Sequence, residues 1–256
     1  MKHARHLVLI ILMIAAGMSS CSKDISVGNA DGAKNRNVAM DVFITFNGNA
    51  FSKDSIYFDA AGNPFVIDDF RMIISNFFVE DMGDTITDTT AFAVIQPGIV
   101  SYELLDLPAG SYSGSYGFTI GLDEQDNAKV PNQFPASSGL RDPELYRGAT
   151  GLYSGYRFVL IVGRAFDPMK PTETEPSLPF TYELGSTLKV DVRRGKNFTL
   201  SNDQRATFDL RLDIGTMMAP FNVIDTETIQ SRPNMTSDWA NAQLFQSQID
   251  SSLVLF

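Results

Sequence analysis

The chain of 256 residues has one cysteine and two histidines, and all three lie near its N-terminus. His3 and His6 precede a short apolar run, and Cys21 follows it. If this leader is removed and the cysteine carries lipid, the remaining domain has no free imidazole and no free thiol. That excludes Ser-His-Asp and Cys-His catalysis, zinc sites built on Cys or His, haem ligation by His, and disulfides. We therefore expect a protein that is not an enzyme; paired-carboxylate glycosidase chemistry is the remaining catalytic alternative.

Basic residues are also scarce. The chain has 20 Lys and Arg against 30 Asp and Glu, and loss of Lys2 and Arg5 with the leader changes the balance to 18 − 30 = −12. Nucleic acid is a poor partner for such a surface, because its phosphates require clusters of Lys and Arg. The one basic cluster, residues 193–196, is interpreted as a hairpin turn in solvent.

The N-terminus is typical of a lipoprotein signal peptide. Lys2 and Arg5 precede the apolar run 7–16, which is too short to span a membrane. Met18-Ser-Ser-Cys21 then resembles a lipobox, in which a peptidase cuts before the cysteine and the thiol is diacylated. An ordinary signal peptide followed by a stray cysteine is the alternative. We predict a signal peptide over residues 1–20 and lipidation at Cys21, with the acyl chains anchoring the protein to a membrane.

Residues 21–37 consist of Ser, Gly, Asn, Asp, Ala and Lys with few apolar side chains, which predicts a lipidated flexible tether. Ser22-Lys-Asp24 favours the outer membrane, facing either the periplasm or the cell surface. The folded domain is then expected over residues 38–256.

Short apolar runs separated by turn residues predict an all-β domain, an antiparallel β-sandwich of about eight or nine strands. Apolar and polar residues alternate over 38–46, and a second alternating run covers 206–214. Residues 83–90 are expected to form a loop, and the Pro-rich stretch 166–179 neither a central strand nor a helix. Further strands are expected at 56–58, 65–67, 70–79, 91–95, 116–123, 155–163, 188–192, 197–200 and 252–256.

One short C-terminal helix is expected. After a candidate N-cap at Ser237, Trp239, Ala242, Phe245 and Ile249 fall on one face at 100° per residue.

Five segments, in order, resemble the MbnP-like copper-binding protein family. They are Phe70-Arg-Met-Ile-Ile-Ser-Asn-Phe-Phe-Val79, Leu107-Pro-Ala-Gly-Ser-Tyr112, Phe118-Thr-Ile-Gly-Leu-Asp123, Gly155-Tyr-Arg-Phe158 and Phe180-Thr-Tyr-Glu-Leu-Gly185. The resemblance implies a secreted or lipid-anchored bacterial β-sandwich. It also implies copper held by two histidines and an oxidised tryptophan. Here the tryptophan position corresponds to Tyr146 or Arg147, and Glu183 stands where the family often has histidine.

The residues themselves suggest two other kinds of metal site. Asp123, Glu124 and Asp126 share one loop and form a candidate calcium site, because calcium prefers clustered carboxylate oxygens. Methionines could hold copper(I), but they form no Met-x-Met array, and adjacent Met217 and Met218 are better interpreted as packing residues.

The long polar excursion over residues 123–154 is the expected ligand-binding region. Tyr146, Arg147 and Tyr153 within it, together with Glu183, are the candidate ligand-binding residues, since Tyr and Arg are common at recognition hot spots. The opposing interpretation is that these side chains only hold the loop in place.

The sequence thus favours a membrane-anchored, non-catalytic binding lipoprotein with an unknown ligand and no assigned cofactor. One alternative is a protein that handles copper or calcium through carboxylate and tyrosine ligands. A second is a surface adhesin or an accessory subunit of an envelope complex.

Overall fold

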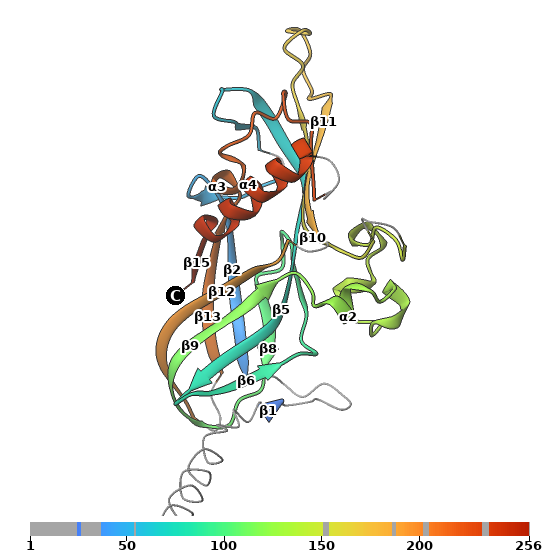
Figure 1. Cartoon of the computed structure of the whole chain (residues 1–256). Helices are drawn as coiled ribbons and strands as arrows, with labels where there is room; N and C mark the ends of the chain where they lie inside the picture. Colours follow the sequence, from blue (N-terminus) through green and yellow to red (C-terminus); the bar gives the residue numbers. More distant parts are fainter. Residues whose placement is uncertain are drawn as a thin grey trace, which may run out of the picture.

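A computed structural model describes residues 25–26, 37–53, 55–150, 154–185, 188–201, 205–231 and 236–255. Within these residues the strands form a ten-stranded and a five-stranded sheet, which pack face to face around the core (Figure 1). The all-β class and the sandwich are therefore confirmed.

The larger sheet has the order β1-β6-β5-β10-β11-β14, with β4, β7 and β9 joined to β5, and β12 joined to β9. Its strands are β1 (Ile25–Ser26), β4 (Tyr57–Phe58), β5 (Pro64–Asp81), β6 (Asp84–Asp88), β7 (Ala93–Ile95), β9 (Gly110–Ile120), β10 (Arg157–Ala165), β11 (Leu178–Gly185), β12 (Val190–Leu200) and β14 (Thr228–Gln230). The smaller sheet contains β15 (Leu253–Leu255), β13 (Ala206–Asp213), β2 (Val38–Phe46), β3 (Asn49–Ala50) and β8 (Ser101–Leu105).

Several strands are longer than the sequence suggested. The runs 65–67 and 70–79 belong to the single strand β5, and β6 occupies the predicted loop 83–90. The cluster 193–196, expected to be a turn, lies inside β12, which pairs with β9 along its whole length. The Arg193 guanidinium lies 5.1 Å from the Phe78 ring centre and forms an ion pair with Glu80. Two residues of β5 therefore compensate the charge of Arg193 on β12.

Most pairings are antiparallel, as expected, but β13 pairs with β2 in parallel from Ala206↔Val38 to Asp213↔Thr45. A parallel pair needs a long crossover connection. Here the connection is the chain between residues 46 and 206, and it includes most strands of the larger sheet. The strand direction could therefore not be deduced from either strand alone.

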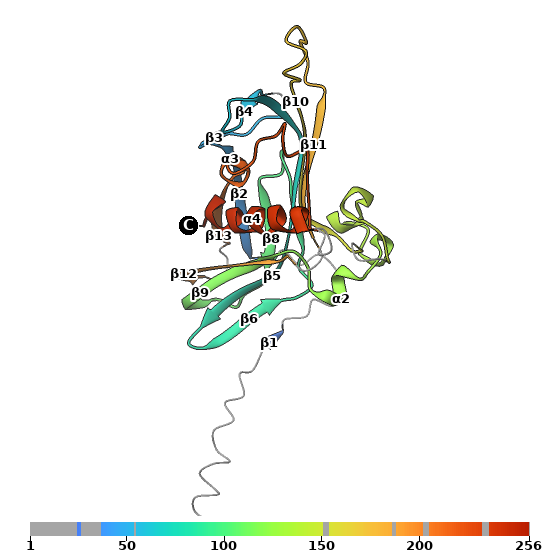
Figure 2. The same ribbon diagram turned by 45° about the horizontal axis from the view of Figure 1, so that its top comes forward.

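Helix α4 (Thr236–Ser252) crosses the sandwich beside α3 (Ile214–Met218) and packs against strands of both sheets (Figure 2). The predicted face is confirmed: Ala242, Phe245 and Ile249 are buried and Trp239 packs against the core. The helix begins at Thr236, so Ser237 lies within it. Met217 and Met218 are buried in α3, as packing residues. Among the described residues, no helix combines the length and apolarity needed to cross a membrane.

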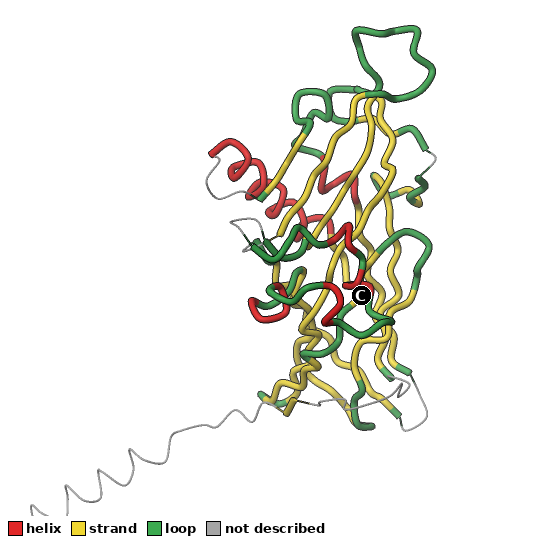
Figure 3. Tube along the Cα trace, turned by 90° about the vertical axis from the view of Figure 1, so that its right-hand side faces the viewer, coloured by secondary structure: helices red, strands yellow, loops and turns green. Residues whose placement is uncertain are grey.

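The strands run along the domain, and the Pro-rich connection between β10 and β11 projects from one end as a loop (Figure 3). The excursion after β9 contains α2 (Glu124–Asn127) and three short 3-10 turns, η1 (Pro131–Gln133), η2 (Gly139–Arg141) and η3 (Pro143–Leu145). It lies on the outer face of the larger sheet, away from β2 and β13 (Figures 1 and 2).

A second apolar cluster fills the space between the excursion and the sheet. Ile73 of β5 and Phe158 of β10 meet Leu140 and Leu145 of the excursion there. Both strands are therefore buried on two faces over part of their length, with Met72–Ser75 and Phe158–Ile161 all buried. Uninterrupted apolar sequence is the expected signature of such two-sided burial.

Asp213, at the end of β13, joins β2, the turn that follows β2, and helix α3. Its carboxylate accepts hydrogen bonds from the backbone N–H groups of Asn47 (3.0 Å), Gly48 (2.6 Å) and Thr216 (3.0 Å), and from Thr45 Oγ1. Partial burial opposes ionisation of this carboxyl, but the hydrogen bonds outweigh burial and hold its pKa below the usual value.

We predict that Asp213→Ala lowers the free energy of unfolding by about 2 kcal/mol, because it removes a helix N-cap and charge-assisted hydrogen bonds. Since the folded-state pKa is the lower one, this contribution is complete above the unfolded pKa of about 3.9 and is lost as pH falls through the folded value. Urea unfolding at pH 7 and at pH 3 should therefore show the difference between wild type and variant shrinking. Asp209→Ala, on the same strand, is the control and should change stability by less than about 0.5 kcal/mol.

Candidate functional site

The outer face of the larger sheet carries a cleft of about 650 Å³ beside the excursion. Its floor follows from strand register. One row of paired residues is Asp69, Val162, Thr181 and Thr228, and the next is Arg71, Leu160, Glu183 and Gln230. Because side chains alternate along a strand, residues two apart on each of these strands face the same side. Arg157 and Glu144 complete the lining.

Glu183 is the most buried charge of this region. Its side chain is only 5% exposed, yet both of its oxygens are paired. Arg147 Nη2 lies 3.0 Å from Oε1, and Arg157 Nε donates to Oε2 at 2.5 Å. The Arg147 side chain is itself only 7% exposed, and its Nη1 donates to Ser231 Oγ at 3.4 Å. A buried carboxylate is stable only with such compensation, since desolvation of an isolated charge costs several kcal/mol.

Arg71 forms a second ionic group at the cleft. It pairs with Asp69 on its own strand at 2.8 Å, and with Asp142 and Glu144 of the excursion, the latter at 2.8 Å. Arg157 adds a bond to the Glu144 carbonyl at 2.5 Å. The arginines of the sheet therefore fasten the excursion to the cleft's edge.

Hydrogen bonds from backbone N–H groups hold the end of the excursion. Asn127 Oδ1 accepts from the Tyr156 N–H at 2.7 Å, and Arg147 N donates to Gly155 O at 2.8 Å. Gly155 has φ of +91°, and a Cβ there would lie 2.4 Å from Asn127 Oδ1. Glycine is therefore needed at this return into β10.

Two phenols lie under the excursion. Tyr146 and Tyr156 pair as an isolated bridge, with ring centres 5.1 Å apart, and both hydroxyls are buried without a hydrogen-bond partner among the described residues. Burial, with a smaller contribution from Tyr146, raises the pKa of Tyr156 well above its usual value. Tyr156 is therefore uncharged, and both rings pack in the second apolar cluster.

The candidate ligand-binding residues consequently have different roles. Arg147 and Glu183 contact each other, and Tyr146 contacts Tyr156. Glu183 lines the cleft, but Arg147 is not among its lining residues. Tyr153 and Cys21 lie outside the described residues.

The carboxylates of the candidate calcium loop are occupied locally. Asp123 caps α2 by accepting from Asp126 N at 2.7 Å, and Asp126 pairs with Lys129 at 2.5 Å. Glu124 is exposed in the first turn of α2. In the part of the chain that the structure describes, no three His, Cys, Asp or Glu residues converge to hold a metal ion. These three positions therefore do not form a ligand cage in this conformation.

The copper ligands implied by the family resemblance do not fit the residues present either. A metal ion needs free lone pairs, but both Glu183 oxygens point at guanidinium groups. A cationic Arg147 beside Glu183 also repels a second cation. We derive no copper chemistry from this site.

The sequence did not single out Asp69, Arg71, Thr181, Thr228 or Gln230 as site residues. A signal was present for Arg71, because a charge inside an apolar strand such as 70–79 is costly unless it is paired. The neutral residues carry no comparable signal, since only strand register brings them together.

Comparison with known proteins identifies one family. The family model MbnP matches residues 35–236. Among solved structures, MbnP from Methylosinus trichosporium aligns with 13% sequence identity and a TM-score of 0.46, covering 75% of this chain and 80% of that chain. No curated protein matched.

We predict that the buried pair can be removed only as a unit. Glu183→Leu alone should lower the free energy of unfolding by about 3–5 kcal/mol, because Arg147 is left buried without its counterion. Arg147→Met combined with Glu183→Leu should recover most of that loss. Urea unfolding of these two variants and of Arg147→Met alone gives the coupling energy as a double-mutant cycle.

The matched control is the exposed pair Asp68–Arg164, which joins the same strands β5 and β10 with both N–O distances at 2.9 Å. Asp68→Ala should cost at most about 1 kcal/mol. A double variant as unstable as the sum of its singles would contradict the prediction.

Proposed function

Because the chain belongs to the MbnP family, we propose that it is a lipid-anchored, non-catalytic binding protein of the bacterial outer membrane whose ligand site is the charged cleft. The observation that carries the proposal is the state of Glu183. Its two oxygens are engaged by arginines, so this carboxylate is occupied within the chain, and the neutral side chains beside it remain to hydrogen-bond a ligand.

The composition of the cleft indicates the type of ligand. Thr181, Thr228 and Gln230 line one side with neutral donors and acceptors, and Leu160 and Val162 form an apolar strip beside them. A small organic molecule with both polar and apolar parts matches this lining, since specific pockets combine apolar walls with a few placed polar groups.

Absence of catalysis is supported by the arrangement of charges. A general base must be free to accept a proton from substrate, whereas Glu183 and Glu144 each bind arginine. Binding and release of a ligand require the cleft but no catalytic residue.

Two alternative functions would depend on other features of the chain. A copper- or calcium-handling protein would need Glu183 to leave its arginines. An adhesin or accessory subunit of an envelope complex would use a protein partner rather than a small ligand, and the loop between β10 and β11, with Met169 exposed at 87%, is the segment best placed for it.

Native mass spectrometry of the protein extracted from its own membranes separates these functions. We predict a small non-covalent ligand on the wild type that is lost in Thr181→Trp, where the indole fills the cleft. Thr199→Trp, exposed on β12, is the control and should retain it.

Stoichiometric copper or calcium lost in Glu183→Gln would instead support metal handling. A stoichiometric protein partner that survives Thr181→Trp would support the envelope-complex alternative, and a chain without any of these masses would contradict the cleft as a ligand site.

Lipid anchoring makes a separate prediction. Cys21→Ser should move the protein from the membrane fraction to the soluble fraction, because acyl chains supply the membrane affinity. Metabolic labelling with a fatty acid should mark the wild type and not the variant. A labelled or membrane-bound Cys21→Ser protein would rule out anchoring through this residue.

A further inference from the structure

Arg157 has N–H donors that the described residues leave unused. A guanidinium carries five N–H donors. Among the described residues Arg157 meets two acceptors: Nε donates to Glu183 Oε2 and Nη1 to the Glu144 carbonyl, each at 2.5 Å. Nη2 has no acceptor in this part of the chain, and the side chain is 27% exposed at the wall of the cleft. Since two bonds fix the planar guanidinium, Nη2 is held in one position.

The carboxylates of the cleft do not satisfy this donor. Glu183 shares its charge between Arg157 and a second guanidinium at its other oxygen. Asp69 and Glu144 both pair with Arg71. Each carboxylate that lines the cleft therefore already binds an arginine, while Nη2 of Arg157 does not bind a carboxylate. A fixed cationic donor of this kind recognises an anionic oxygen, because charge-assisted hydrogen bonds are the strong ones.

Three neutral side chains add hydrogen-bonding capacity. Gln230 is paired with Glu183, in the row nearer Arg157, and Thr228 is paired with Thr181 in the next row. The side chains of Gln230, Thr181 and Thr228 have no hydrogen-bond partner among the described residues. A side-chain amide donates through its N–H2 group. Gln230 and Arg157 therefore offer donors on either side of Glu183, one for each oxygen of a ligand carboxylate.

An apolar strip leads away from Arg157 along β10. Leu160 and Val162 line the cleft in successive rows, which are about 7 Å apart along the strand. A ligand whose carboxylate meets Arg157 has room for a short apolar body over this strip. Asp69 and Glu144 lie on the other side of the strip from β11 and disfavour additional negative charge, since like charges brought together cost affinity.

We propose that the cleft binds an organic monocarboxylate with a short apolar body. Arg157 Nη2 and the Gln230 amide hold the carboxylate, and Leu160 and Val162 contact the body. The threonine hydroxyls are left for a polar group at the far end of the ligand. This inference rests on the function proposed for the cleft and names the class of ligand.

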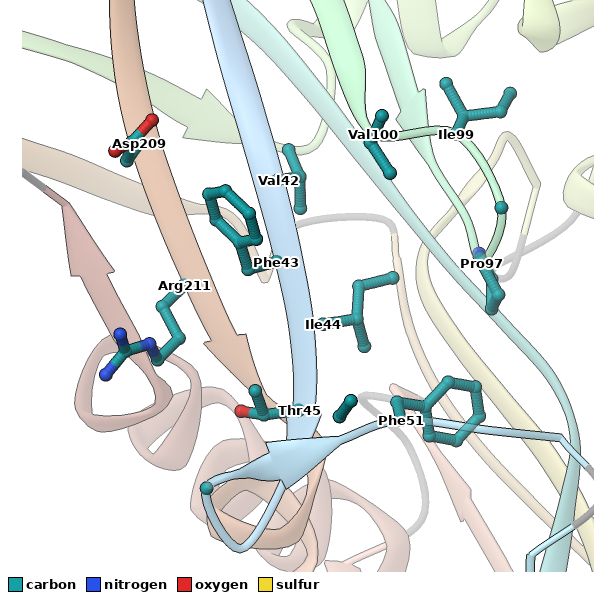
Figure 4. Close-up of a pocket in the computed structure, with 13 residues that line it drawn as sticks. Val42, Phe43, Ile44, Thr45, Phe51, Pro97, Ile99, Val100, Asp209 and Arg211 are labelled. Atoms are coloured by element: carbon teal, nitrogen blue, oxygen red, sulfur yellow. The ribbon is translucent and has the colours of Figure 1, made fainter.

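A second hollow, of about 670 Å³, has a different lining. It lies on the smaller sheet, where Phe43, Ile44 and Val100 are among the apolar side chains around it (Figure 4). Its neutral polar side chain, Thr45, already donates to Asp213. This hollow has room for the apolar part of a small molecule, so variants must assign any binding to one site or the other.

Isothermal titration calorimetry of the full chain in detergent tests the proposal with three probes that share one apolar body. They are hexanoate, its neutral amide hexanamide, and the dianionic hexyl phosphate. We expect hexanoate to bind with a Kd of about 1 mM or below, and the other two probes to bind at least about tenfold more weakly.

Variants assign the binding to the cleft. Arg157→Lys removes Nη2 but keeps a cation beside Glu183, and we expect it to weaken hexanoate binding at least about fivefold. Gln230→Leu should weaken it at least about threefold. Arg164→Lys, on the same strand but outside the cleft, is the control and should change affinity by less than about twofold. Thermal unfolding identifies a misfolded Arg157→Lys protein, and Gln230→Leu then decides the outcome.

Other results overturn the proposal. Hexanamide that binds as tightly as hexanoate, with both lost in Thr181→Trp, leaves the cleft as a ligand site and excludes the carboxylate. Hexyl phosphate that binds most tightly excludes a monocarboxylate. Unchanged affinity in both Arg157→Lys and Gln230→Leu excludes the assigned contacts. Hexanoate that is lost in Val100→Trp but kept in Thr181→Trp binds in the second hollow instead.

The failure of this inference can be told from the failure of the proposed function. No binding of hexanoate at about 10 mM excludes the monocarboxylate. If native mass spectra still show a ligand that Thr181→Trp removes, the cleft remains a ligand site for another class of molecule. If those spectra show no such ligand, the proposed function fails with the inference.

Discussion

The structure depends on how one buried carboxylate is neutralised. Glu183 lies in the middle of β11, and its charge is tolerable only because Arg147 and Arg157 reach it from two directions. Arg147 belongs to the excursion and Arg157 to the strand that follows it. The ion group therefore fixes the point where the excursion rejoins the sheet, and with it the edge of the cleft.

The same ion group shows how an acidic side chain is kept inside a sheet. A carboxylate among apolar strands requires a cation, and either a metal or a guanidinium can supply one. Arg147 supplies the cation as part of the fold, and its planar guanidinium contacts both Glu183 and Ser231. A guanidinium on the chain cannot be released, so this ion group contributes to the structure.

The fold could be predicted from the sequence because its signals are local. Only the spacing of apolar residues is needed to find the strands at 38–46 and 206–214. The same holds for the helical face of Ala242, Phe245 and Ile249. The site could be predicted only in part. Glu183 and Arg147 were singled out, but their contact and the rows formed with Thr228 and Gln230 depend on register between distant strands. Residues 193–196 show the opposite error, because Arg and Gly suggested a turn where pairing with β9 imposes a strand.

The two outer faces show how one alternating pattern serves two purposes. On β5 the outward positions change from Asp69 and Arg71 to Ile73, and the change marks where the excursion begins to cover the sheet. On β2 the outward Asp41 and Phe43 have no such cover among the described residues, although the pattern is similar. On the first face Asp69 and Arg71 form an ion pair within the chain. One alternating pattern can therefore end either beneath a covering segment or at the surface, and the strand's own sequence does not distinguish the two.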